Sequence, residues 1–164
     1  MPMDSVAIAQ IVVLLMLANG APVIGKLILG DRWATPVDFG LVMRDGHRLF
    51  GRSKTVRGIL LAIIVTSAAA PLIGLDWLDG LVIATAAMIG DLASSFIKRR
   101  LGMESSSRAT GLDQIPESLL PALAAQSRLG LSYPDVAIVA LVFFVGEVAL
   151  SRILYRLKLR ERPY

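Results

Sequence analysis

Four polar residues lie close together near the end of the apolar segment 78–97. Asp91, Ser94, Ser95 and Lys98 are spaced i, i+3, i+4 and i+7, so a helix would place them on one face. A carboxylate at the centre of a membrane helix costs about 2.5–3.5 kcal/mol, but Asp91 would lie only about 10 Å from Lys98 along the helix axis. We expect this face to line a wet cavity. A local hydrogen-bond network between helices is the alternative.

A second acid, Asp113, stands where the chain enters the next apolar segment. A helix-capping role would be ordinary there. Paired across a bundle with Asp91, however, it would supply a second hard oxygen ligand for Mg²⁺ bound to phosphates. Such two-carboxylate sites are typical of phosphoryl and nucleotidyl transfer. Sequence spacing does not establish that Asp91 and Asp113 meet.

The loop "RDGHRLFGRSKTVRG" at 44–58 is rich in glycine, hydroxyls and basic residues, as an anion-binding loop should be. It approaches a Walker A pattern through Gly46 and Gly51, but Arg52 replaces the lysine and no apolar strand precedes it, which excludes a P-loop NTPase. A cluster of donors remains at the start of a helix, where phosphate is favoured: Ser53, Lys54, Thr55 and Arg57. The alternative is a basic anchor that touches lipid headgroups.

Three further features leave their roles open. The cluster "NGAPVIG", residues 19–25, either breaks the first apolar helix around a protected cavity or makes a simple proline kink. Glu147, in the middle of the last apolar segment, belongs either to the cavity or to a structural ion pair. His47 is the single histidine, so a zinc site built from several histidines is excluded.

The composition indicates the elements that must position these groups. The 164 residues are 55% hydrophobic and only 18% charged, with a mean hydropathy of +0.66, which is typical of an integral membrane protein. No cysteine is present, so there is no disulfide framework. The first apolar segment has no basic n-region and is interpreted as a retained helix. The length suits one domain, residues 1–164.

We therefore predict an all-α polytopic bundle with about five transmembrane helices. The fourth segment is the least secure, because prolines and charges interrupt it, and a re-entrant segment with four spans is the alternative. The apolar segments are 6–29, 56–75, 78–97, 115–131 and 136–157.

The basic residues predict an orientation. Of the 17 Lys and Arg, all but Arg128 fall in three regions that five spans would place on one side: 26–57, 98–108 and 152–162. The N-terminus is then outside, and the C-terminus is cytoplasmic. The net charge of +4 fits anionic lipid better than nucleic acid, so a nucleic-acid partner is not expected.

Three segments together resemble the CDP-archaeol synthase family of membrane cytidylyltransferases, distant relatives of bacterial CDP-diacylglycerol synthases. The order and intervals of these segments fit that family, and the resemblance extends over essentially the whole chain. The segments are "DGHRLFGRSKTVRG" (45–58), "GDLASSFIKRRLG" (90–102) and "LDQIPES" (112–118).

The resemblance implies a five-helix bundle that requires CTP and Mg²⁺ and transfers CMP to a lipid phosphate with release of pyrophosphate. Asp91 and Asp113 would hold the metal, and with Lys54 and Lys98 they form the expected catalytic set. The residues expected to bind CTP are Asn19, Ser53, Lys54, Thr55, Arg57, Ser94, Lys98 and Arg99. His47 stands where lysine is common in the family, which leaves open an ether-linked archaetidic-acid-like or an ester-linked phosphatidic-acid-like acceptor.

Other functions remain as alternatives. A CTP-dependent polyprenol kinase would transfer the γ-phosphoryl group of CTP to a lipid hydroxyl. A non-catalytic membrane subunit or transporter would use Asp91 and Glu147 for packing or ion passage. The expected partners are CTP, a lipid phosphate and the cytoplasmic membrane, with the active site on the cytoplasmic side. Self-association into a homo-oligomer is compatible with this reading.

Overall fold

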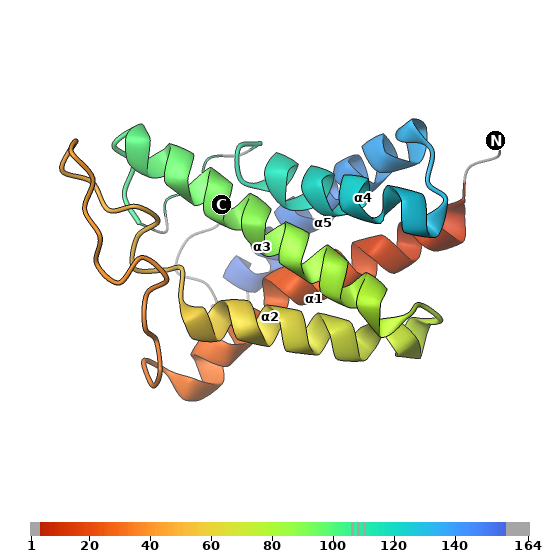
Figure 1. Ribbon diagram of the computed structural model, residues 1–164, viewed down its shortest axis with the longest axis horizontal. Helices are drawn as coiled ribbons and strands as arrows, with labels where there is room; N and C mark the ends of the chain where they lie inside the picture. The colour runs from red at the N-terminus through yellow and green to blue at the C-terminus, as the bar shows by residue number, and fades with distance from the viewer. Residues whose placement is uncertain (1–3, 106, 108, 110, 157–164) are drawn as a thin grey trace.

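The computed structural model describes residues 4–105, 107, 109 and 111–156, and this part of the chain is an all-α bundle (Figure 1). It contains two isolated β-bridges but no strand. The helices are α1 (Ser5–Leu29), α2 (Val56–Ala69), the 3₁₀ helix η1 (Ala70–Ile73), α3 (Trp77–Arg100), α4 (Gln114–Leu129) and α5 (Tyr133–Arg156). The predicted all-α membrane bundle is confirmed.

Four helical segments of the described chain are long and apolar enough to cross a membrane: Ser5–Leu29, Val56–Ile73, Trp77–Arg100 and Tyr133–Leu150. The remaining α-helix, α4, has only 16 residues, fewer than the roughly 20 that a span needs. Its polar residues Gln114, Glu117 and Ser118 are buried. The least secure of the predicted spans is therefore a short helix whose polar side faces the protein.

The first helix is continuous, so of the two alternatives for residues 19–25 the break around a cavity is wrong. Pro22 lies inside α1, which runs without interruption from Ser5 to Leu29. The side-chain amide of Asn19 donates to the carbonyl of Leu15 at 3.1 Å, one turn back in the same helix. The proline is accommodated because it removes a single backbone donor from a helix that stays regular on both sides.

Helix starts follow the local capping signals. Asp4 accepts the N–H of Ala7 at 3.0 Å, and Thr55 accepts the N–H of Gly58 at 3.1 Å. Asp76 and Asp79 form a capping box at the start of α3. Asp79 also pairs with Arg128 Nε at 2.5 Å, which ties the start of α3 to the end of α4.

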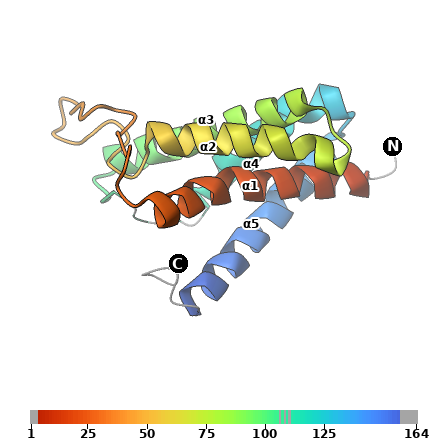
Figure 2. The same ribbon diagram turned by 90° about the horizontal axis from the view of Figure 1, so that it is seen from below.

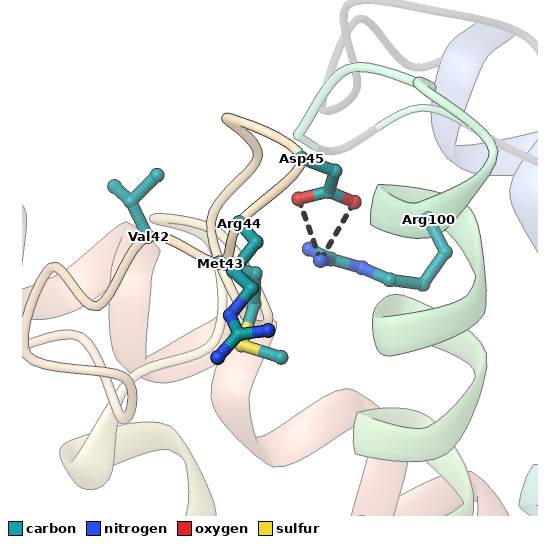
Figure 3. A pocket seen from close by; sticks show the side chains of 5 residues that line it. All are labelled: Val42, Met43, Arg44, Asp45 and Arg100. Atoms are coloured by element: carbon teal, nitrogen blue, oxygen red, sulfur yellow. Dashed lines mark hydrogen bonds and ion pairs between the residues drawn. The ribbon is translucent and has the colours of Figure 1, made fainter.

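The loop between α1 and α2 is a folded unit at the end of the bundle where α3 terminates (Figures 1 and 2). Its base closes through the bridge Pro36–Thr55, and its outer part closes through Val42–Arg48. Arg100 at the end of α3 holds the loop by donating to Asp45 Oδ1 at 2.8 Å and to the carbonyl of Arg48 at 2.7 Å. An open cavity lies between the loop and Arg100, lined by Val42, Met43, Arg44 and Asp45 (Figure 3).

Two glycines allow α3 to approach its neighbours closely. A Cβ on Gly80 would lie 2.7 Å from the carbonyl oxygen of Thr66 in α2. A Cβ on Gly90 would lie 2.9 Å from the backbone nitrogen of Glu117 in α4. Both contacts are with backbone, which cannot move aside as a side chain can, so the separation of these helices depends on the missing Cβ atoms.

The first prediction concerns Gly80. Gly80→Ala should lower the free energy of unfolding by about 1–3 kcal/mol, since the new methyl group overpacks the α2–α3 contact. Thermal unfolding in detergent measures the change. Gly20→Ala is the matched control, because nothing lies within 4 Å of a Cβ at Gly20 in the interior of α1 and alanine is the better helix former. Equal effects of the two changes would contradict the packing explanation.

Candidate active site

An ion pair joins two of the predicted catalytic residues. Lys54 Nζ lies 2.5 Å from Asp91 Oδ1, with side-chain exposures of 23% and 17%. Lys54 comes from the loop just before α2, and Asp91 comes from the last three turns of α3. The structure therefore brings the glycine-rich loop and the polar face of α3 together, as the sequence predicted for a shared site.

The acids around Lys54 keep it charged. Burial alone would lower the pKa of the Lys54 ammonium group, but the Asp91 carboxylate outweighs this, with Glu117 and Asp113 acting in the same direction. The pKa is therefore raised above its ordinary value of 10.5. The charged Lys54 therefore contributes to the stability of the folded state in full at any pH below 10.5. This contribution to stability is lost only as the pH rises through the higher pKa of the folded state.

Glu117 is a site residue that the sequence analysis missed. Its side chain is buried and lies within hydrogen-bonding reach of the Asp91 carboxyl. The close approach of α3 and α4 at Gly90 brings the two acids together. One signal was present, because Glu117 follows Asp113 by four residues and so lies on the same face of the helix. Glu147 of α5 is also near enough to interact electrostatically with Glu117.

A second ion pair joins the other two predicted catalytic residues. Lys98 Nζ lies 2.6 Å from Asp113 Oδ1 and donates to the carbonyl of Ser107 at 2.9 Å. The other oxygen of Asp113 accepts the N–H of Ala109 at 3.0 Å. Asp113 precedes α4 but makes no side-chain cap bond to it. Its carboxylate therefore binds Lys98 and the loop, and does not serve the capping role that was the alternative.

The acids fit a divalent cation only together with phosphate oxygens. Within the described residues, no group of three or more His, Asp or Glu is arranged to hold a metal ion. Asp91 and Asp113 each pair with a different lysine, while the adjacent acids are Asp91 and Glu117. Mg²⁺ commonly binds one or two carboxylates plus substrate phosphates and water, which this donor set can provide. A metal shared by Asp91 and Asp113 stays a prediction.

Three predicted CTP-binding residues lie around these ion pairs. Ser94 is buried and donates to the carbonyl of Asp91 at 3.0 Å. Arg99 is buried and donates to the carbonyl of Glu104. Ser53 accepts a hydrogen bond from Ser105 at 3.3 Å. Of these contacts, the one between Ser53 and Ser105 joins the α1–α2 loop to the loop after α3.

Three other predicted residues have local partners. Asn19 donates within α1, and Thr55 caps α2. The Arg57 guanidinium donates to the carbonyls of Gly30 and Arg32 near the end of α1. Their contacts with nucleotide stay predictions, since each side chain would have to exchange its present partner for CTP.

Known proteins are similar to this chain over nearly its whole length. A protein-family model described as "CarS-like: CDP-archaeol synthase" matches residues 5–76 and 72–164. The CDP-archaeol synthase of Aeropyrum pernix is 38% identical over 91% of this chain and 86% of its own length. The enzyme of the same name from Pyrobaculum arsenaticum is 32% identical over 90% of this chain and 91% of its own length.

One solved structure is also similar. It is described as an intramembrane enzyme for archaeal membrane lipid biosynthesis, and it superposes with a TM-score of 0.69 at 33% identity. The match extends over 84% of this chain and 90% of that chain.

The second prediction tests the contact between Lys54 and Asp91. Lys54→Met and Asp91→Asn should each destabilise the fold, and the double variant should lose less than the sum, with an interaction energy of about 1–3 kcal/mol. Unfolding of all four proteins in detergent measures it. The control is the pair Asp45 and Arg100, changed to Asn and Gln, which should couple more weakly because the Asp45 side chain is 40% exposed, against 17% for Asp91. Additive effects at Lys54 and Asp91 would contradict the contact.

Proposed function

The chain belongs to the CDP-archaeol synthase family, and from this premise we propose how its polar site performs the reaction. The protein is a CTP-dependent cytidylyltransferase of the membrane that forms a CDP-lipid from CTP and a lipid phosphate. The observation that supports our assignment of the site is the pairing of Lys54 with Asp91, beside Glu117, where the glycine-rich loop meets α3.

The reaction joins two anions. A phosphate oxygen of the lipid attacks the α-phosphorus of CTP, and the bond from that phosphorus to the oxygen bridging it to the β-phosphorus breaks, releasing pyrophosphate. The attacking oxygen is already charged, so no general base is needed. The barrier comes from bringing the anions together and from charge that develops on the leaving group, and positioning with fixed cations lowers both.

Cationic side chains perform that task in the proposed site. Lys54 turns from Asp91 toward the triphosphate, while Lys98 and Arg99 contact phosphate at the end of α3. Hydroxyl and amide donors complete the binding set: Asn19, Ser53, Thr55 and Ser94, with Arg57 at its edge.

The carboxylates of the site are the proposed metal ligands. Asp91 and Asp113 are the proposed ligands of Mg²⁺, and the Glu117 carboxyl lies within hydrogen-bonding reach of Asp91. When bound, the ion would neutralise charge on the triphosphate and on the departing pyrophosphate. With Asp91 holding the metal, Lys54 would be free to contact the nucleotide.

The lipid and the nucleotide reach the site by different routes in this proposal. The acceptor enters sideways from the inner leaflet, and CTP enters from the cytosol, because the polar residues cluster at the basic end of the bundle. Although α4 is short, it runs back along α3, from Asp113 beside Lys98 to Arg128 beside Asp79, so the chain returns to the outer side before α5. On this proposal the N-terminus is outside and the C-terminus is cytoplasmic. The relatives are named CDP-archaeol synthase, so an ether-linked, archaetidic-acid-like lipid phosphate is the first acceptor to test and ester-linked phosphatidate the second.

The third prediction tests the reaction. Purified protein with Mg²⁺ and CTP labelled at the α-phosphorus should transfer label to an ether- or ester-linked lipid phosphate, whereas label at the γ-phosphorus should leave as pyrophosphate. With a polyprenol supplied as a further acceptor, label from the γ-position in lipid would indicate the polyprenol kinase alternative. Absence of label in lipid with every acceptor would contradict the proposed function. Chelation should stop turnover, and Mg²⁺ should restore it.

The same assay distinguishes the site residues. Asp91→Asn and Asp113→Asn should each lower turnover at least roughly 100-fold while the protein stays folded, because each removes one carboxylate charge from the metal site. A monodisperse profile in gel filtration checks folding. Full activity of either variant would remove that residue from the site.

The fourth prediction tests orientation. The chain contains no cysteine, so each introduced cysteine is unique. In intact cells a membrane-impermeant maleimide should label Ser5→Cys at the start of α1. Asp31→Cys, in the exposed loop after α1, should react only after permeabilisation. The reverse pattern would place the active site outside.

A further inference from the structure

The α1–α2 loop contains one deeply buried acid, Asp38. Its side chain has 0% exposure, although Phe39 and Gly40 beside it are exposed. A buried carboxylate is costly unless charges and hydrogen bonds compensate it. Asp38 is outside the predicted catalytic and CTP-binding sets, and it makes no contact with their side chains in any recorded hydrogen bond or ion pair of the described residues.

The charge of the buried Asp38 carboxylate is balanced by groups from both halves of the loop, before and after residue 45. One oxygen accepts Arg48 Nε at 3.3 Å and the N–H groups of Phe50 at 3.2 Å and Gly51 at 2.9 Å. The other accepts the N–H of Gly40 at 3.1 Å and forms an ion pair with the Arg48 guanidinium. Burial alone would raise the pKa of the Asp38 carboxyl, but Arg48 and these N–H groups lower it to about 2. The group is therefore ionised throughout the neutral pH range.

These bonds fix the start of the donor segment, residues 51–55. Gly51 has φ +97°, and a Cβ there would lie 2.9 Å from Ser105 Oγ, so its backbone fits tightly against the loop that follows α3. The N–H of Val37, next to Asp38, donates to the carbonyl of Lys54 at 2.8 Å. Asp38 and its neighbour thus hold the segment at both Gly51 and Lys54.

We propose that Asp38 is a positioning residue for CTP: it holds the donor segment so that Ser53, Lys54 and Thr55 are placed for the triphosphate before the nucleotide arrives. The inference rests on the proposed function. Asp38 acts through the backbone of Gly51 and through Arg48, and it does not touch the nucleotide. Pre-organisation of this kind strengthens binding, because less ordering remains to be done when the ligand arrives.

The test is Asp38→Asn. Asparagine has the same shape, but it lacks the charge, and its NH₂ group would face N–H donors. We expect the KM for CTP to rise at least about tenfold, with kcat and the KM for lipid phosphate changing less than about threefold. CTP should also raise the melting temperature of the protein, and the variant should need correspondingly more CTP for half of that shift. Asp38→Glu, which retains the carboxylate, should lie between the variant and the wild type.

Asp31→Asn is the matched control, since it makes the same change at an exposed site of the same loop. It should leave both KM values unchanged. An unchanged KM for CTP in folded Asp38→Asn would overturn the inference. So would equal rises in both KM values together with a lower melting temperature, because these indicate a merely structural role.

A second variant tests the inference if Asp38→Asn does not fold. Arg48→Met then serves as the test, because it removes the charge partner and leaves the three backbone bonds to Asp38. It should raise the KM for CTP selectively, and an unchanged value would overturn the inference. Failure of the wild type to form any CDP-lipid would instead contradict the proposed function, and the CTP-dependent melting shift would still measure the role of Asp38.

Discussion

The contact between Lys54 and Asp91 is the constraint on which the rest of the site depends. An acid near the end of an apolar helix needs a counter-charge, because burying a carboxylate alone is costly. No basic residue of α3 precedes Lys98, so the ammonium group comes from the loop before α2. That requirement brings the loop over the end of the bundle and sets where a nucleotide would meet both parts.

The loop itself is held by polar contacts and has little apolar packing. Trp33, Phe39, Leu41 and Val42 are exposed, so they contribute little to its stability. Inside the loop, Asp38 accepts the N–H of Gly51 and so joins its first half to its second half. From α3, Arg100 donates to the carbonyl of Arg48 in the outer part of the loop. The order of the loop therefore comes from charges and hydrogen bonds, in which the N–H groups of Gly40, Phe50 and Gly51 are bound to Asp38.

The helices of the bundle differ in which side chains they turn outward. Its long helices present apolar side chains such as Ile24, Ile64 and Leu141 on the outside, as lipid requires. The short α4 instead turns Glu117 and Ser118 inward. A short helix can carry such residues on the side that its neighbours shield from lipid. The Glu117 carboxyl at the site therefore comes from the buried side of α4, while Ile115, Leu120 and Leu123 on the same helix are exposed.

Much of the fold was predictable from the sequence, because hydropathy over 20 residues and local caps such as Thr55 and Asp76 depend on near neighbours alone. The motif residues Lys54, Asp91, Lys98 and Asp113 were recognisable for the same reason. Their partners were not: spacing could not show that Asp113 meets Lys98, that Glu117 meets Asp91, or that Asp38 holds Gly51. Those pairings join residues distant in sequence. They depend on how closely backbones approach, as at Gly90, and only the tertiary structure determines that distance.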